Sequence, residues 1–306
     1  MTRARGVADY GYYPPVNNNI LINPSFTVFQ RAGTTASGGW GVDHAVDGYG
    51  PDRWYLRGVG NVGGGKLESS TEVDAATGIN KLLVKHSSAG SHAYVEQFIE
   101  AVNIQGLYGK EMTLSFSYSD VGGSGIPKVF IRSWDALATL KSLYEAVPTS
   151  LGDNRWTCTV TLSTADGTVP NPNEIGMDVV IFPNEQNNAP DEWSVWETKL
   201  EVGSVVTPFI ARQYGEELAL CQRYFKNGSL TMCFPGVGGR YGYNNLDSQQ
   251  YRAAPSCTIG FVGNSTNTIR GIGVTNPIGL TYNIYVQTEI NSVLDGVVNW
   301  TADAEL

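Results

Sequence analysis

The chain has 306 residues and a formal net charge of −9. This acidic balance disfavours non-specific binding to nucleic acid, which needs a basic surface, and no apolar run approaches the roughly 20 residues of a membrane-spanning helix. The 36 glycines, a charged fraction of only 16% and frequent Tyr, Trp, Thr, Ser, Asn and Val are typical of β-strands joined by tight turns. The length fits two domains or one large β domain, and so few charges indicate that partners cover part of the surface.

Residues 1–18 have the composition of an extended arm. Polar, Gly- and Pro-containing sequence stands where a signal peptide would have an apolar stretch, so we expect a chain that is made in a cytoplasm and leaves it, if at all, by lysis. The pair Pro14-Pro15 favours an extended path. A disordered terminus and a tether into a larger assembly both fit, because tyrosines favour interfaces. The tyrosines that would anchor such a tether are Tyr10, Tyr12 and Tyr13.

Strand patterns dominate from residue 19 to about residue 212. In residues 112–118, Met, Leu, Phe and Tyr alternate with Thr and Ser, which gives one apolar and one polar face. Turn signals at 122–125 and 166–167 separate such segments. The further segments that read as strands are 82–85, 93–98, 128–132, 156–162 and 176–182. Several short strands with regularly spaced turns predict a two-sheet sandwich.

A short helix is predicted over residues 215–225, between the longer β-rich region and a shorter one. Glu216 and Glu217 would occupy its first turn, where negative charge suits the helix dipole, and Asn227-Gly228 would end it as a C-cap. Its apolar stripe consists of Leu218, Cys221, Tyr224 and Phe225. Residues 229–306 then read again as strands and loops, a piece that is small for an independent core.

Motifs for nucleotides and for cysteine chemistry are weak. Residues 58–63 match G-x-G-x-x-G, but no helical pattern follows that would place a helix N-terminus at a pyrophosphate. Residues 60–66 nearly match a P-loop, but Leu67 stands where that motif needs a Ser or Thr.

No cysteines show a C-x-x-C spacing, so we expect free buried thiols. The cysteines are Cys158, Cys221, Cys233 and Cys257.

Two acidic clusters were candidates for glycoside hydrolysis, which needs two carboxylates about 5–10 Å apart. They consist of Asp43, Asp47 and Asp52, and of Asp191, Glu192, Glu197 and Glu201. Acidic residues in polar loops are usually only solvated, the chain lacks the repeat of a parallel β-helix, and no histidine lies near a nucleophile signature. We therefore expect no enzyme activity, with a glycan-degrading enzyme as an alternative.

Two other clusters combine aromatic rings with hydrogen-bonding groups, as sugar sites do. Rings stack on the apolar faces of pyranoses, while Asn, Asp and Arg bond the hydroxyls. The candidate glycan contacts of the first cluster are Trp40, Asp43, Asp47 and Tyr49. Those of the second, in a predicted loop over 240–245, are Arg240, Tyr241, Tyr243 and Asn244. Trp54 and Trp156 lie inside strand patterns, so we expect them in the core.

Several passages resemble one family of proteins. Residues 217–225 (Glu-Leu-Ala-Leu-Cys-Gln-Arg-Tyr-Phe) resemble a recurrent segment of bacteriophage tail-fibre and related virion-surface proteins. Residues 20–26 resemble the opening strand of that family's carbohydrate-binding-module-like domain, and residues 200–209 resemble its closing strand. Residues 252–256 and 300–306 resemble the module that follows. The motifs occur in the family's order and span most of the chain.

The resemblance implies an all-β protein of three parts. These are a virion-attachment arm (1–18), a carbohydrate-binding-module-like jelly roll (19–212), and a short helix with a smaller C-terminal β module (213–306). A jelly roll brings its first and last strands together, so the segment at Ile20 is expected beside residues 195–202. Strands are also implied over 133–148, although the spacing of Trp134, Leu137, Leu140 and Tyr144 is helical.

The implied function is that of a tail-fibre or receptor-binding subunit that recognises host surface polysaccharide without catalysis. It would form a homotrimer on the virion surface, on the tail or the capsid exterior, joined to other virion proteins by its arm. A purely architectural role, as a capsid decoration or tail brace, is the alternative. Related modules often hold a structural calcium, to which Asn23, Asp191 and Glu201 could contribute oxygens. No loop shows a dedicated ligand spacing, so we expect no metal or cofactor.

Overall fold

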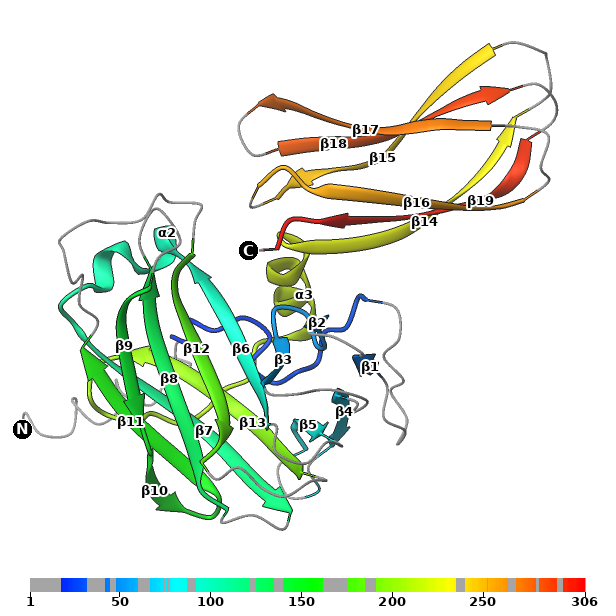
Figure 1. Cartoon of the computed structure of the whole chain (residues 1–306). Coiled ribbons are helices and arrows are strands. Elements are labelled where there is room, and N and C mark those ends of the chain that lie inside the picture. Colours follow the sequence, from blue (N-terminus) through cyan, green and yellow to red (C-terminus); the bar gives the residue numbers. More distant parts are fainter. Residues whose placement is uncertain are drawn as a thin grey trace, which may run out of the picture.

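The architecture is a β-sandwich followed by a smaller β module (Figure 1). It is given by a computed structural model, which describes residues 18–31, 42–44, 48–59, 67–73, 75, 78–86, 92–121, 125–134, 140–161, 175–184, 191–234, 240–251, 253–263, 268–278, 281–290 and 294–305. The predicted sandwich is confirmed, since all strand pairs in its two stacked sheets are antiparallel. None of the described helices is long and apolar enough to cross a membrane.

The first sheet has seven strands in the order β1-β4-β5-β13-β7-β11-β10. Their bounds are Val42–His44 (β1), Leu67–Val73 (β4), Asn80–His86 (β5), Asp191–Val202 (β13), Glu111–Val121 (β7), Arg155–Thr161 (β11) and Thr149–Gly152 (β10).

The second sheet has six strands in the order β2-β3-β6-β12-β8-β9. Their bounds are Gly48–Tyr49 (β2), Tyr55–Val59 (β3), His92–Glu100 (β6), Ile175–Pro183 (β12), Pro127–Trp134 (β8) and Leu140–Ala146 (β9). A one-turn helix α2 (Ala101–Ile104) and a 3-10 turn η1 (Gln105–Leu107) connect β6 to β7. Within the ambiguous passage 133–148, the described residues 133–134 end β8 and residues 140–146 form β9, so strands are confirmed there. Pairing of β8 with β12 and of β9 with β8 outweighs the helical propensity.

The core lies between the two sheets. The four apolar residues of the alternating segment in β7 all face it, as predicted: Met112, Leu114, Phe116 and Tyr118. Trp54 is fully buried in the same core, and Trp156 is partly buried and packs against it. Each fully buried side chain of this size contributes about 1.5–3 kcal/mol through removal of apolar surface from water.

The opening segment lies beside the closing strand but is not itself a strand. The amide of Ile20 donates a hydrogen bond to the carbonyl of Leu200 at 2.9 Å, which confirms the expected neighbours. Residues 21–25 bend, because Asn23 (φ 54°) and Phe26 (φ 51°) adopt the left-handed conformation, which an extended strand excludes. The side chain of Asn23 binds three backbone groups of Thr27 and Val28 and the carbonyl of the distant Asp52.

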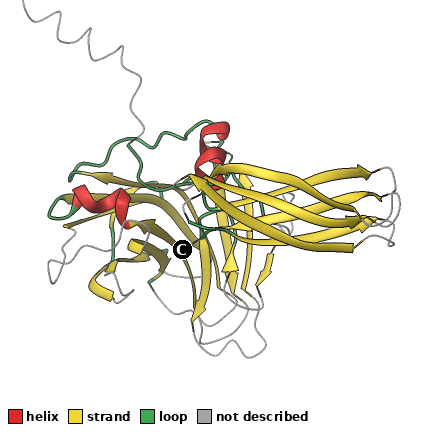
Figure 2. Cartoon of the chain, turned by 90° about the horizontal axis from the view of Figure 1, so that it is seen from above, coloured by secondary structure: helices red, strands yellow, loops and turns green. Residues whose placement is uncertain are grey.

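Helix α3 (Tyr214–Gln222) lies between the sandwich and the C-terminal module (Figure 2). Glu216 and Glu217 occupy its first turn, as predicted. Cys221 and Tyr224 pack with Ile22 of the opening segment, so part of the predicted apolar stripe serves to fix the helix on the sandwich.

The predicted end of the helix was wrong. The helix stops at Gln222, Phe225 begins the next strand, and Asn227 and Gly228 lie within that strand instead of forming a C-cap. Pairing decides this, because Gly228 stands opposite Trp300, and a Cβ on Gly228 would lie 2.7 Å from the indole ring. The glycine thus permits a close approach of a ring to the backbone.

The C-terminal module consists of two three-stranded sheets, ordered β14-β19-β16 and β15-β18-β17. Their bounds are Phe225–Phe234 (β14), Leu294–Asp303 (β19), Ser256–Gly263 (β16), Arg240–Gln250 (β15), Thr281–Ile290 (β18) and Thr268–Ile278 (β17). Its buried cluster contains Tyr251, Ile284, Trp300, Ala302 and Ala304. The loop predicted over 240–245 is wrong, because these residues pair with β18 as part of β15.

The cysteines described with their side chains are free thiols. Cys158 and Cys221 are buried, and Cys257 is half-buried, which confirms the expectation of unpaired cysteines at these three positions. Burial raises the pKa of Cys158 to about 12, so its thiolate is scarcely populated near neutral pH.

Candidate ligand-binding face of the six-stranded sheet

The outward face of the six-stranded sheet is built by strand alternation. In β6, Val95, Gln97 and Ile99 point inward, so Tyr94, Glu96 and Phe98 point outward. Register then places outward residues of the other strands beside them. We call the resulting surface the aromatic–ionic face, and it comprises Tyr55, Arg57, Tyr94, Glu96, Phe98, Lys128, Phe130, Arg132, Asp178, Val180, Phe182 and Glu145.

Two arginines converge on one glutamate at the centre of this face. Arg132 donates to the Glu96 carboxylate at 2.8 Å and to Asp178 at 2.7 Å. Arg57 approaches the other oxygen of Glu96 at 2.9 Å. The four side chains come from β3, β6, β8 and β12, so the ionic network ties four strands together. Charge-assisted pairs of this kind hold the participating side chains in fixed positions.

The charges of this network lie at two levels. The side chains of Glu96 and Asp178 are 0% exposed, whereas those of Arg132 and Arg57 are 19% and 40% exposed. Burial raises the pKa of Glu96 to about 7, against the opposing attraction of Arg57. The carboxylates therefore form the floor of the network and the guanidinium groups its accessible part.

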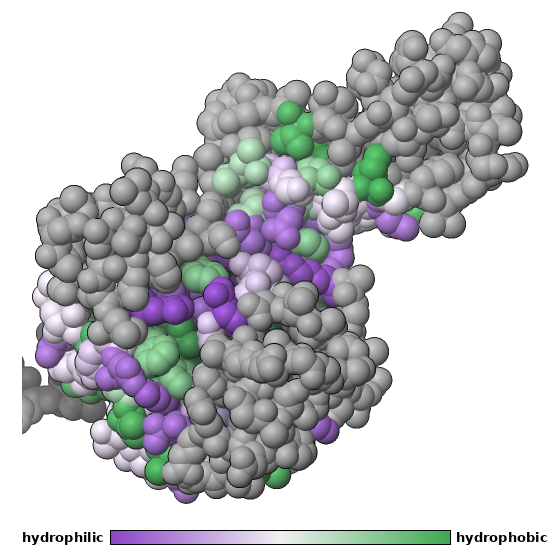
Figure 3. Space-filling view, in the orientation of Figure 1, coloured by the Kyte–Doolittle hydropathy of each residue, from purple (hydrophilic) through white to green (hydrophobic). Residues whose placement is uncertain are grey.

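Aromatic rings flank the ionic centre. The rings of Phe130 and Phe182 are 4.8 Å apart, and that of Tyr94 lies 6.4 Å from Phe182. The ring of Tyr55 lies 6.4 Å from Phe98 on the other side of the network. Figure 3 shows strongly hydrophilic and hydrophobic residues next to one another on the sandwich. Rings beside fixed hydrogen-bonding groups are what a small polar ligand with apolar faces requires.

The outward face of the seven-stranded sheet has a different composition. On this side of β7 lie Thr113, Ser115, Ser117 and Ser119, the residues between the core positions. Ser119 bonds Ser194 at 2.8 Å, and Thr113 bonds Thr159 at 3.2 Å. Strands β11 and β13 of this sheet also carry ion pairs, Arg155 with Glu197 at 3.5 Å and Lys199 with Glu201 at 3.2 Å. Within the described strands, what distinguishes the six-stranded sheet is the cluster of rings beside its ion pairs.

The candidate contacts named from the sequence do not form this face. Trp40, Asp47 and the arm tyrosines Tyr10, Tyr12 and Tyr13 lie outside the described residues. Asp43 lies in β1, an edge strand of the seven-stranded sheet, whereas Tyr49 lies in β2, an edge strand of the six-stranded sheet. The structure therefore separates two residues that the sequence placed in one cluster.

Tyr49 packs at the junction between the sandwich and the C-terminal module. Its ring meets that of Tyr55 edge-on at 5.0 Å, and the guanidinium of Arg31 lies 4.3 Å above its centre. Its hydroxyl is buried, and this burial raises the pKa of Tyr49 well above its usual range. Arg31 also contacts Phe225 of the module at 4.0 Å, so Tyr49 has a packing role here.

The second predicted cluster lies on β15 of the C-terminal module. In the strand register, Tyr241 and Tyr243 stand opposite Glu289 and Gln287 of β18, and Arg240 and Asn244 stand opposite Ile290 and Val286. The side chains of these four residues lie outside the described part of the chain. The start of β15 lies at the end of the module far from α3 (Figure 1). These residues remain candidate glycan contacts, but they lie in the C-terminal module, whereas the aromatic–ionic face lies on the sandwich.

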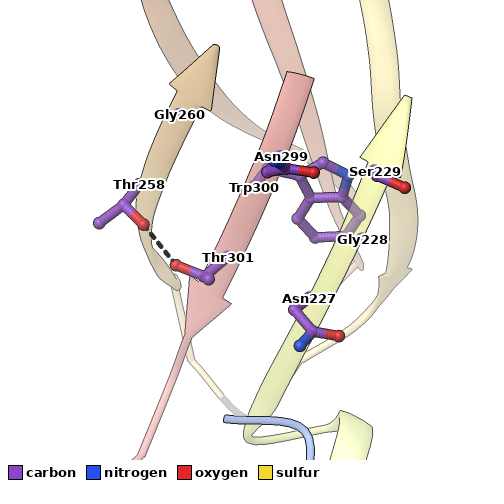
Figure 4. Close-up of a pocket in the computed structure, with 8 residues that line it drawn as sticks. All are labelled: Asn227, Gly228, Ser229, Thr258, Gly260, Asn299, Trp300 and Thr301. Carbon is purple, nitrogen blue, oxygen red and sulfur yellow. Dashed lines mark hydrogen bonds between the residues drawn. The ribbon is translucent and has the colours of Figure 1, made fainter. Parts of the chain in front are cut away.

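A hollow lies on the β14-β19-β16 sheet of the C-terminal module (Figure 4). It has a volume of about 550 Å³ and is lined by Asn227, Gly228, Ser229, Thr258, Gly260, Asn299, Trp300 and Thr301. Thr258 and Thr301 bond each other at 2.5 Å. The lining side chains are uncharged, and most of them are small.

Two of the three residues that could contribute oxygens to a structural calcium are engaged in other contacts. Asn23 binds backbone groups of its own turn, and Glu201 accepts hydrogen bonds from Thr207 and Asn18. The side chain of Asp191 lies outside the described residues. Among the side chains that the structure describes, no group of three His, Cys, Asp or Glu residues is placed to hold a metal ion.

The aromatic–ionic face was missed because its members are scattered along the chain. Its local signal is the outward series Tyr94, Glu96, Phe98 and the outward series Lys128, Phe130, Arg132. Each series alternates aromatic and charged residues on the side of a strand where small polar residues are usual. Two such strands predict a functional sheet face only if they are known to lie in the same sheet.

Comparisons with known proteins give a fold likeness. No protein-family model matches the chain, and no curated protein matches it by sequence. The sandwich is similar to carbohydrate-binding-module-like β-sandwich domains. One is the C-terminal family 22 carbohydrate-binding module of Clostridium thermocellum, at 15% identity over 63% of this chain and 100% of that chain, with a TM-score of 0.35. Another is a putative sugar-binding protein of Bacteroides thetaiotaomicron, at 12% identity over 60% of this chain and 100% of that chain, with a TM-score of 0.34.

The chain is also similar to part of a bacteriophage protein. The enzymatically active domain of tailspike protein 4 of bacteriophage CBA120 matches at 12% identity with a TM-score of 0.35. The match covers 60% of this chain and 21% of the tailspike chain, so the matched part of this chain spans about a fifth of that structure.

Proposed function

We propose that the chain is a non-catalytic glycan-binding subunit of a bacteriophage virion and that the aromatic–ionic face is its binding surface. The observation that carries the proposal is the meeting of clustered rings with a fixed ionic network on one sheet face. Rings of Tyr94 and Phe130 offer flat apolar surface to the apolar side of a sugar ring. Guanidinium groups of Arg57 and Arg132 offer donors to its hydroxyls.

The rigidity of the face favours binding. Glu96 and Arg132 are held by each other and by the neighbouring strands, so little side-chain freedom is lost when a ligand arrives. Both carboxylates of the network are buried and engaged with arginine, which supports binding without cleavage of a glycosidic bond. Glycan hydrolysis would need one acidic carboxyl and one base reaching the scissile bond.

The virion assignment is supported by the ordered motifs at 20–26, 200–209, 217–225, 252–256 and 300–306. In this proposal the chain forms a homotrimer on the virion surface, held to other virion proteins by the arm of residues 1–18. Several copies would multiply weak contacts into useful avidity. The trimer is tested by light scattering of the full chain at working concentration, where a monomer would remove the basis for avidity.

The binding proposal is tested by exposing the full chain to a panel of bacterial surface polysaccharides and plant oligosaccharides. We expect saturable binding that Tyr94→Ala weakens at least about tenfold, equivalent to about 1.4 kcal/mol. The control Tyr214→Ala removes a tyrosine that is 59% exposed on α3 and should leave binding unchanged. If no polysaccharide of the panel binds, the architectural role is favoured instead. A fall in polymer mass during incubation would show that the chain is an enzyme.

A further inference from the structure

The accessible charge over the central network of the aromatic–ionic face is positive. The exposed fractions of Arg57, Arg132 and Lys128 side chains are 40%, 19% and 25%, while Glu96 and Asp178 are 0% exposed. A ligand lying over the central network therefore contacts guanidinium groups, and the carboxylates of Glu96 and Asp178 remain beneath them. This layering contrasts with the chain as a whole, which carries a net charge of −9.

The two arginines provide most of this positive character. Lys128 pairs with Glu145, whose side chain is 46% exposed, so the charges at that rim offset each other. Arg57 and Arg132 share the single buried carboxylate of Glu96, and Arg132 also binds Asp178. Arg57 is the most exposed charged group of the central network. It projects between the rings of Tyr55 and Tyr94, at 5.3 and 6.0 Å from their centres.

Resting on the proposed glycan-binding function, we infer that the face selects acidic polysaccharides, whose sugars carry carboxylates, over neutral ones. A sugar carboxylate is ionised at neutral pH. Beside Arg57 it would form a charge-assisted pair for which guanidinium geometry is well suited. The neighbouring tyrosines would at the same time cover the apolar side of the sugar ring. A neutral sugar would gain the stacking but not the ion pair.

The test compares each bound acidic polysaccharide with a neutral derivative of itself. The probes are oligogalacturonate, alginate oligosaccharides, hyaluronan oligosaccharides and sialylated oligosaccharides, each beside its carboxyl-reduced or methyl-esterified form, with xylan and cellulose oligosaccharides as neutral ligands. We expect at least one acidic probe to bind about tenfold or more tightly than its neutral form, measured by titration calorimetry.

Two variants assign the effect to its residue. Arg57→Gln should bring the ratio of acidic to neutral affinity close to one. Its amide still offers donors to sugar hydroxyls, so the acidic form should lose more affinity than the neutral form. Lys110→Gln makes the same change in net charge at an exposed turn outside the face and should preserve the preference. Circular dichroism of both variants verifies that they fold.

The outcomes separate this inference from the proposed function. Equal binding of acidic and neutral forms, or binding of neutral probes alone, would overturn the charge selectivity and leave glycan binding intact. A preference that survives Arg57→Gln would also overturn it. Binding of none of the probes would instead remove the proposed function, and the selectivity with it.

Discussion

Arg53 of the sandwich forms a buried ion pair with Glu305, which follows the last strand of the C-terminal module. The two side chains are 1% and 5% exposed. The guanidinium of Arg53 also lies 3.6 Å from the centre of the Tyr224 ring and donates to the carbonyl of Phe98. One cation thus contacts the sandwich, the turn after α3 and the end of the module, so it fixes how the module sits on the sandwich.

Loss of the charge on Glu305 should destabilise the protein strongly. Glu305→Gln leaves the buried Arg53 without its counter-charge, and breaking a buried ion pair in this way costs about 3–5 kcal/mol. Asp303→Asn is the matched control, because the Asp303 side chain is 43% exposed and surface pairs contribute about 0–1 kcal/mol. Urea denaturation followed by tryptophan fluorescence measures both. Equal midpoints for the two variants would contradict this role of Arg53.

Two glycines of the same sheet should respond differently to a methyl group. Gly228→Ala places a Cβ 2.7 Å from the Trp300 ring, whereas a Cβ on Gly260 meets no atom within 4 Å. Overpacking of this kind costs about 1–3 kcal/mol, so Gly228→Ala should lower the unfolding free energy of the module. Gly260→Ala should change it by no more than about 0.5 kcal/mol. Thermal unfolding of the two variants decides the point, and similar midpoints would argue against the close ring contact.

Glu96 should make stability depend on pH. Burial raises the pKa of Glu96 from an ordinary value of 4.5 to about 7, so the folded chain holds this proton more tightly than the unfolded chain. Its stabilising contribution is then complete below about pH 4.5 and is lost as the pH rises through about 7. Arg57 and Arg132 oppose this shift and Asp178 adds to it.

The measurement compares the native chain with Glu96→Gln, which cannot titrate. Between about pH 5 and pH 8 the native chain should lose on the order of 1–3 kcal/mol of unfolding free energy relative to the variant. Urea denaturation at intervals across that range gives the two curves. Parallel curves would show that Glu96 has nearly the same proton affinity in the folded and unfolded chains.

Asn23 should be among the least replaceable polar residues of the opening segment. Its amide donates to the carbonyls of Val28 and Asp52 at 2.9 and 3.0 Å, and its oxygen accepts from the amides of Thr27 and Val28. Asn23→Ala removes these bonds in a buried turn and keeps a left-handed φ, which should cost about 2–4 kcal/mol.

A suitable control for Asn23 is Asn80, whose amide makes a longer bond of 3.3 Å to the carbonyl of Phe26. Asn80→Ala should cost about 1 kcal/mol or less. Hydrogen exchange of the amides of Thr27 and Val28 provides a local readout. Their exchange should accelerate in the Asn23 variant and stay slow in the Asn80 variant.

Local sequence patterns predicted the structure correctly where a residue's environment depends on its neighbours in the sequence. The alternation in residues 112–118 predicted an inward apolar face because one side of a strand in a sandwich meets the core. The acidic pair Glu216-Glu217 correctly marked the start of α3. Local pattern failed at Asn227-Gly228, where a helix C-cap and a strand glycine have the same sequence. The distant Trp300 decides between them.

The residues of the candidate site, too, could not be identified from local sequence patterns. Tyr49 looked like a ligand contact because it stands among glycines and acidic residues, yet in the structure it packs beneath Arg31. The alternation around Glu96 did not by itself identify a site, because its partners Arg57 and Arg132 come from strands on either side of it in the fold.

The sequence alone determined that this chain would form antiparallel strands around an apolar core, with one helix before its last module. Alternation and turn chemistry act between near neighbours and can be read directly from the chain. The tertiary structure decided which outward residues share a surface, since strand register brings Arg57, Glu96 and Arg132 together from three strands. It also decided which charges lie below the surface and which remain accessible, because burial depends on everything packed around a side chain.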